Sequence, residues 1–132
     1  TMTRLVLSRF SNGLHVAFAI FLFHLSAMHA QSADFYTDVF PILKANCIAC
    51  HNSQKSDGGR NLESFEALQK GGDSGATYTA DSAEKSNLVR RIKGEDELMP
   101  PKGNNVGARQ LTPSEINLIQ SWIVEGALAG TN

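Results

Sequence analysis

Apolar residues recur at steps of three and four in several stretches of the chain, which is the spacing of an amphipathic helix. The first such stripe contains Phe35, Val39 and Leu43, and the last contains Ile119 and Trp122. The pattern predicts four short helices, at residues 34–46, 62–70, 81–93 and 112–126. No segment shows the alternation of a half-buried strand. We therefore predict an all-α fold in which long loops connect the helices.

Residue types near the ends of these stretches indicate helix boundaries. In residues 112–115 a Thr, a Pro and a Glu occupy positions favoured for the N-cap, N1 and N3 of a helix. Residues 81–84 have a similar arrangement, and the glycines at 71–72 end the second helix because Gly tolerates left-handed backbone. Pro41 is expected to kink the first helix or to restart it.

The start of the chain differs from the rest. Arg4 and Arg9 precede an almost wholly apolar run at residues 14–25, which is short for a membrane span. This order predicts a signal peptide at residues 1–30, and an uncleaved anchor is the alternative, the one case in which we expect contact with a membrane. Residues 31–132 are then a single domain, exported to the periplasm or an equivalent compartment.

The charge of the chain gives no case for a nucleic-acid partner. There are 12 Lys and Arg residues against 13 Asp and Glu, and the basic residues are scattered rather than clustered. Removal of residues 1–30 matters more, because it takes three of the 4 histidines and two of the 3 methionines. His51 and Met99 are then alone of their kinds.

One segment carries a specific chemical signature. Residues 47–51 read Cys-Ile-Ala-Cys-His, which is the C-x-x-C-H pattern of c-type haem attachment. The thiols of Cys47 and Cys50 would add to the two haem vinyl groups, and His51 would bind the iron as the proximal ligand. We therefore predict one covalently attached haem c. A large apolar cofactor would also enlarge the thin core of so small and loop-rich a domain.

Three rival interpretations of the cysteine pair are weaker. A closed zinc site needs four ligands, and the chain beyond the leader offers three Cys and His residues. A thioredoxin-type pair lies at a βαβ junction, and no such pattern is present. A simple disulfide leaves the adjacent histidine unexplained.

Met99 is the candidate for the second axial ligand of the iron. His/Met ligation is the usual pairing in cytochromes c, and Pro100 and Pro101 restrict the backbone that presents Met99. A lone methionine could instead serve in core packing. The iron would then have an open sixth position or a Lys ligand.

Several further residues have a possible role beside the haem. Arg90, Arg91 and Lys93 could neutralise the haem propionates, or could form a solvated helix face. Residues 95–97 are acidic and are expected to form a solvated turn. Trp122 is expected to pack the last helix on the first, near Phe40 or the haem edge.

The ordered set of motifs resembles the planctomycete-type cytochrome c domain over about residues 34–127. The segments that carry the resemblance are Phe40-Pro41-Ile42-Leu43, the 47–51 motif, Met99-Pro100-Pro101-Lys102, Leu111-Thr112-Pro113 and Trp122-Ile123 with Gly126. The resemblance implies an all-α cytochrome c fold around one haem, with His51 proximal and Met99 distal. Residues 103–110 lengthen the loop between the methionine and the last helix.

We predict that the protein is an electron carrier and not an enzyme. With both axial positions filled, the iron would carry single electrons between redox partner proteins, which dock weakly and transiently on a monomer. Two further functions stay open. One is a haem sensor or peroxidase with a labile sixth ligand, and the second is the electron-entry module of a larger enzyme.

Overall fold

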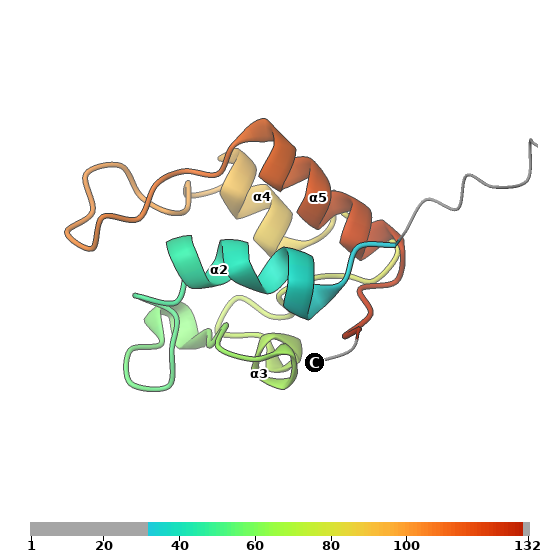
Figure 1. Ribbon diagram of the computed structural model, residues 1–132. Coiled ribbons are helices and arrows are strands. Elements are labelled where there is room, and N and C mark those ends of the chain that lie inside the picture. Colours follow the sequence, from blue (N-terminus) through green and yellow to red (C-terminus); the bar gives the residue numbers. More distant parts are fainter. Residues whose placement is uncertain (1–31, 131–132) are drawn as a thin grey trace, which may run out of the picture. The chain divides into compact units, whose positions relative to one another are not determined.

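The computed structural model describes residues 32–130 of the 132-residue chain (Figure 1). The helical elements of this part, in chain order, are η2 (Phe35–Val39), α2 (Phe40–Asn46), η3 (Asp57–Gly59), α3 (Phe65–Lys70), α4 (Asn87–Lys93) and α5 (Pro113–Val124). Residues 32–130 contain isolated β-bridges but no strand. The prediction of an all-α fold with long loops is therefore confirmed.

The predicted leader lies outside the described residues. Within residues 32–130, no helix has the length and apolar character needed to cross a membrane.

The first predicted helix consists of two segments that differ in hydrogen bonding. Residues Phe35–Val39 form the π-helical turn η2, whose N-cap Asp34 accepts hydrogen bonds from the backbone N–H groups of the next turn. Pro41 lies in the first turn of α2, where a missing N–H group costs no helical hydrogen bond. The expected restart at Pro41 is therefore found.

The middle helices begin later than the apolar pattern predicts. Helix α3 begins at Phe65 rather than at Leu62, because the Ser64 hydroxyl caps it by accepting a hydrogen bond from the Ala67 N–H at 3.1 Å. Helix α4 begins at Asn87, so the predicted start at residues 81–84 is wrong.

Ser86 closes a turn where the start of α4 was expected. Its hydroxyl donates to the backbone oxygen of Ser82 at 2.8 Å and accepts from the Thr79 N–H at 2.9 Å. Such side-chain bonds compete with the helical ladder. Asp81 has a φ of 61°, which is incompatible with a right-handed helix.

Helix α5 has the predicted N-terminus. The Thr112 hydroxyl accepts from the Glu115 N–H, and the Glu115 carboxylate accepts from the Thr112 N–H at 2.8 Å, which is a complete capping box. The helix ends at Val124, and Gly126 follows with a φ of 98°.

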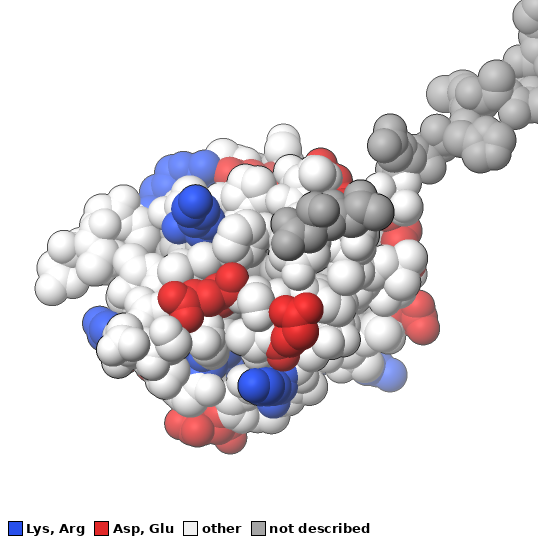
Figure 2. Space-filling view, turned by 60° about the horizontal axis from the view of Figure 1, so that its bottom comes forward, with Lys and Arg blue, Asp and Glu red and all other residues white. Residues whose placement is uncertain are grey.

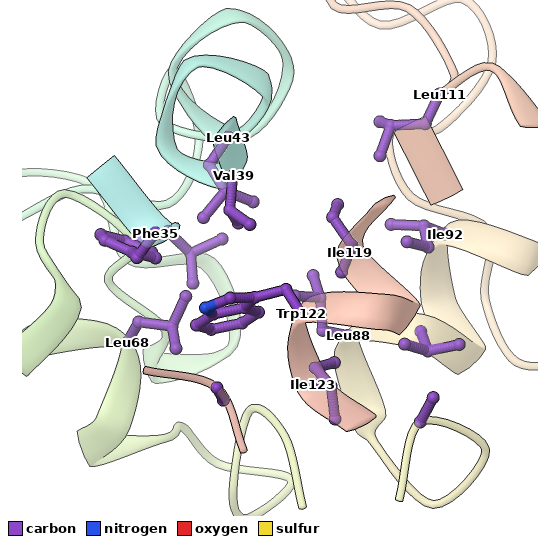
Figure 3. Close-up of a cluster of buried hydrophobic side chains, with 14 residues drawn as sticks. Phe35, Val39, Leu43, Leu68, Leu88, Ile92, Leu111, Ile119, Trp122 and Ile123 are labelled. Carbon is purple, nitrogen blue, oxygen red and sulfur yellow. The ribbon is translucent and has the colours of Figure 1, made fainter. Parts of the chain in front are cut away.

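The core joins α5 to the first helical segment (Figure 3). Trp122 is fully buried, and its ring lies against Phe35 with centroids 5.7 Å apart. Phe65 and Tyr78 complete an aromatic cluster around it. The predicted packing of the last helix on the first is confirmed, with Phe35 rather than Phe40 as the aromatic contact of Trp122.

Candidate functional site

The 47–51 motif forms a tight turn directly after α2. The N–H groups of Cys50 and His51 both donate to the Cys47 carbonyl oxygen, at 3.1 and 3.0 Å. The His51 carbonyl in turn accepts from the Leu62 N–H at 2.9 Å. Leu62 is buried in the core, so this bond anchors the motif to the packed interior.

Helix α4 holds Met99. The Met99 N–H donates to the Arg91 carbonyl oxygen at 3.0 Å, and the Met99–Pro100 peptide bond is cis. Because Arg91 lies near the end of a helix packed on α5, the methionine backbone is fixed relative to the core.

The acidic residues before Met99 are paired rather than simply solvated. Arg90 pairs with Asp96 at 2.8 Å and Arg91 with Glu97 at 2.9 Å. Lys93 pairs with Glu95. Each such exposed pair contributes at most about 1 kcal/mol, but together they connect the last turn of α4 to the loop that leads to Met99. Residues 95–97 form an exposed bend, as expected, and their carboxylates are in addition paired with basic residues of α4.

Two adjoining cavities bring the predicted site residues together. The larger has a volume of about 450 Å³ and the smaller about 100 Å³. Cys47, His51 and Met99 line both cavities, and Cys50 lines the smaller one. The four residues that the sequence singled out therefore face one region, although Met99 is far from the rest in the chain.

Arg60 and Asn104 line the site, but the sequence motifs did not single them out as site residues. Arg60 lines the larger cavity and Asn104 the smaller one. Neither belongs to a motif, and each lies in a loop whose path depends on contacts outside any helical stripe.

Asn104 organises the loop that follows Met99. Its amide nitrogen donates to the carbonyl oxygens of Pro101 and Ala108, at 2.9 and 2.7 Å. Its amide oxygen accepts from the N–H groups of Val106 and Ala108. One side chain thus closes the extended loop at 101–108 beside the site.

Comparison with known proteins identifies the domain. The family model of planctomycete cytochrome c matches residues 47–103. These residues form a planctomycete cytochrome c domain. Proteins of this family carry covalent haem c, take part in electron transfer and typically work outside the cytoplasm.

A solved structure is also similar to this chain. Kuenenia stuttgartiensis hydrazine synthase is 30% identical with a TM-score of 0.47, and the match covers 76% of the present chain and 17% of that chain. The chain therefore spans less than a fifth of the length of that protein. No curated protein sequence matches the chain significantly.

The residues of the cytochrome c domain fit a haem. A volume of about 450 Å³ is within the range of cofactor pockets, and Cys47 and Cys50 are free thiols. Nδ1 of His51 is buried without a hydrogen-bond partner among the described residues, although buried polar atoms are normally bonded. Haem c with His/Met ligation needs two thiols for attachment to the porphyrin, and an imidazole and a thioether as iron ligands. The site contains all four groups.

Burial also affects the protonation of the Cys47 thiol. It raises the pKa of Cys47 to about 12, and the neighbouring Cys50 acts in the same direction. The Cys47 side chain is therefore a neutral thiol at physiological pH. Among residues 32–130, no three His, Cys, Asp or Glu side chains are grouped to hold a metal ion.

Proposed function

We propose that this chain is an exported monohaem cytochrome that carries single electrons, with Cys47 and Cys50 attached to the haem and His51 and Met99 as its axial ligands. The observation that carries the proposal is that His51 and Met99, from opposite ends of the matched domain, line the same two cavities beside both cysteines. When bound, the haem supplies the one-electron iron couple.

The residues of the chain give this site a fixed geometry. His51 is held through its carbonyl by Leu62, and Met99 through its N–H by Arg91. The first anchor is a buried core residue and the second belongs to a helix packed on α5. A site whose two ligands are held in this way suits electron transfer, because little rearrangement accompanies a change of charge.

The chain also offers a surface on which a redox partner could dock. The loop at 103–108 contains no charged residue. It projects to the left in Figure 1, and the projection on the left of Figure 2 is white at its tip, the colour of uncharged residues. Val106, Ala108 and Asn104 from this loop line the smaller cavity next to Cys50. We expect transient docking of a redox protein here, on a monomeric cytochrome.

The experiment is spectroscopy of the purified, exported protein. A pyridine haemochrome spectrum with one haem per chain and two thioether bonds is expected, together with the far-red methionine–iron band of the oxidised protein. Met99→Ala should keep the haem but lose this band and lower the reduction potential, because a thioether ligand favours reduced iron. An unchanged spectrum in Met99→Ala would remove Met99 from the site.

Carbon monoxide binding separates a carrier from a sensor or peroxidase. A carrier with Met99 bound should bind carbon monoxide slowly in the wild type and faster in Met99→Ala. Fast binding in the wild type, with a high-spin spectrum, would contradict the carrier and favour a labile sixth position.

A further inference from the structure

Two arginines from different segments lie on the wall of the larger cavity. Arg60 belongs to the loop before α3, and Arg91 to α4. Both line the larger cavity, which also contains Cys47, His51 and Met99. Neither lines the smaller cavity, which holds both cysteines. The arginines therefore occupy a part of the site away from the Cys50 side.

Arg60 is held in place by neutral groups. Its guanidinium donates to the Thr77 hydroxyl at 2.5 Å, to the Ser74 hydroxyl at 2.9 Å and to the Gly75 carbonyl at 3.3 Å. Thr77 is only 1% exposed. Among the described residues, no carboxylate forms an ion pair with Arg60. Its neighbours therefore position this cation without neutralising it.

Arg91 has a partner at the rim of the cavity. It pairs with Glu97 at 2.9 Å, and the Glu97 side chain is 73% exposed. The second acidic residue of the cavity lining, Asp57, pairs with Lys55 at 3.5 Å. Of the two acidic groups of the lining, Asp57 is thus engaged with Lys55, and Glu97 pairs with Arg91 from a position exposed to water.

The electrostatics of the cavity favour an anion. Burial lowers the pKa of Arg60, the charge of Arg91 lowers it further, and Asp73 opposes both effects. Burial and mutual repulsion both make the charged form of two neighbouring cations less stable. A carboxylate that lies between them, or one that binds each of them, reduces this cost. A guanidinium matches a carboxylate with two parallel hydrogen bonds.

We propose that Arg60 and Arg91 bind the two propionate carboxylates of the haem. This inference rests on the proposed function. In haem, the propionates lie on the half of the porphyrin opposite the vinyl groups, and the arginines are absent from the cavity that contains both cysteines. Arg90 and Lys93, the remaining basic residues of α4, pair with Asp96 and Glu95 and do not line either cavity.

Arg91 connects the propionate end of the proposed site to Met99. The backbone carbonyl of Arg91 holds the Met99 N–H, and its side chain lines the cavity. One residue of α4 would thus bind a propionate and fix the loop of the axial methionine. Ser74 and Asn87 act as positioning residues, because Ser74 accepts from Arg60 and Asn87 donates to the carbonyl oxygens of Ser74 and Ala76.

The test is the pH dependence of the reduction potential in the haem-loaded protein. The variants are Arg60→Gln, Arg91→Gln and, as a matched control from the same helix, Arg90→Gln. A propionate that loses its guanidinium has a higher pKa. The pH at which the potential begins to fall should therefore shift upward in the first two variants and stay unchanged in Arg90→Gln.

Above that pH, the potential of Arg60→Gln and Arg91→Gln should lie below the wild-type value, because an unpaired propionate stabilises oxidised iron. Arg60→Lys keeps the charge without the two-pronged geometry, and should restore part of the wild-type profile. If Arg60→Gln does not accumulate, Arg60→Lys and Arg91→Gln still give the comparison.

Two kinds of result would overturn the inference in distinguishable ways. A haem-loaded wild type whose pH profile is unaffected by the Arg60 and Arg91 variants contradicts the propionate assignment alone. Loss of stability without a change of profile would assign Arg60 to holding the 74–77 loop and also contradict it. A wild-type protein without covalent haem contradicts the proposed function, and the inference with it.

Discussion

At the scale of the residue, the proposed attachment chemistry depends on the turn at residues 47–51. The thiols of Cys47 and Cys50 are free and partly buried, and their spacing is fixed by the backbone bonds that close the turn at the Cys47 carbonyl. Attachment through two thioether bonds needs both sulfurs. The intervening residues contribute spacing and no bonding atom.

Replacement of either cysteine should therefore prevent stable attachment. Cys47→Ala and Cys50→Ala are each expected to lose most of the haem-loaded protein after export, measured as haem-stained protein that resists acid–acetone extraction. Ala49→Ser is the matched control, because Ala49 is exposed within the same turn. Wild-type amounts of haem protein that resists acid–acetone extraction in either cysteine variant would contradict the attachment site.

At the scale of the element, local hydrogen bonds stabilise the loop after Met99 and the start of α5. Asn104 makes four hydrogen bonds within its own loop, whereas the neighbouring Asn105 is exposed and its side chain makes none within the described residues. Loss of the Asn104 amide removes these four hydrogen bonds from the loop next to Met99.

If Met99 is the axial ligand that we propose, Asn104→Ala should weaken its hold on the iron. We expect faster carbon monoxide binding and a smaller far-red methionine–iron band than in the wild type, with Asn105→Ala as the matched control. Equal rates in Asn104→Ala, Asn105→Ala and the wild type would show that the loop does not affect the ligand.

The start of α5 is fastened by Thr112 and Glu115. Removal of an N-cap hydroxyl typically costs about 1 kcal/mol. Thr112→Ala should lower the free energy of unfolding by about that amount in urea titrations, and Ser121→Ala, at an exposed position of the same helix, should change it little. A Thr112→Ala protein as stable as the control would mean that the capping box contributes nothing.

The same capping box gives a pH dependence. The hydrogen bond from Arg109 chiefly lowers the pKa of Glu115, to about 2, and bonds from Thr112 lower it further. A lowered carboxyl pKa stabilises the fold above the ordinary value of 4.5 and loses that effect as pH falls towards 2. Glu115→Gln should therefore reduce the loss of stability between these pH values, measured by thermal unfolding. An identical pH slope in wild type and variant would contradict this.

At the scale of the whole molecule, a cavity lies beside the packed core. The core around Trp122 is packed by Phe35, Phe65 and Tyr78, but a cavity of about 450 Å³ is lined by residues of α4 and of the haem-attachment motif. In a domain of about one hundred residues, the buried fraction of the surface is small, so such a volume matters for stability.

A chain produced without haem attachment should be much less stable than the haem-loaded protein. We expect its urea midpoint, followed by far-UV circular dichroism, to be lower and its transition to be broader, because the apolar cavity wall loses its contacts. The comparison needs equal protein concentration and buffer. Coincident transitions for the two forms would show that the polypeptide alone supplies the stability.

The sequence by itself determined the features whose parts are neighbours in the chain. The C-x-x-C-H motif, the capping box of α5 and the helical stripes each depend on residues within a few positions of one another, so their geometry follows from local backbone structure. Counting the histidines and methionines after residue 30 also singled out His51 and Met99, which the structure brings to the same cavities.

Only the tertiary structure decided the features that join distant segments. Arg60 reaches the cavity because Thr77 and Ser74 hold it, and Arg91 is distinguished from Arg90 by the direction in which α4 packs. The physical reason is common to both: a side chain's partner depends on the path of the chain between them, which no local pattern encodes.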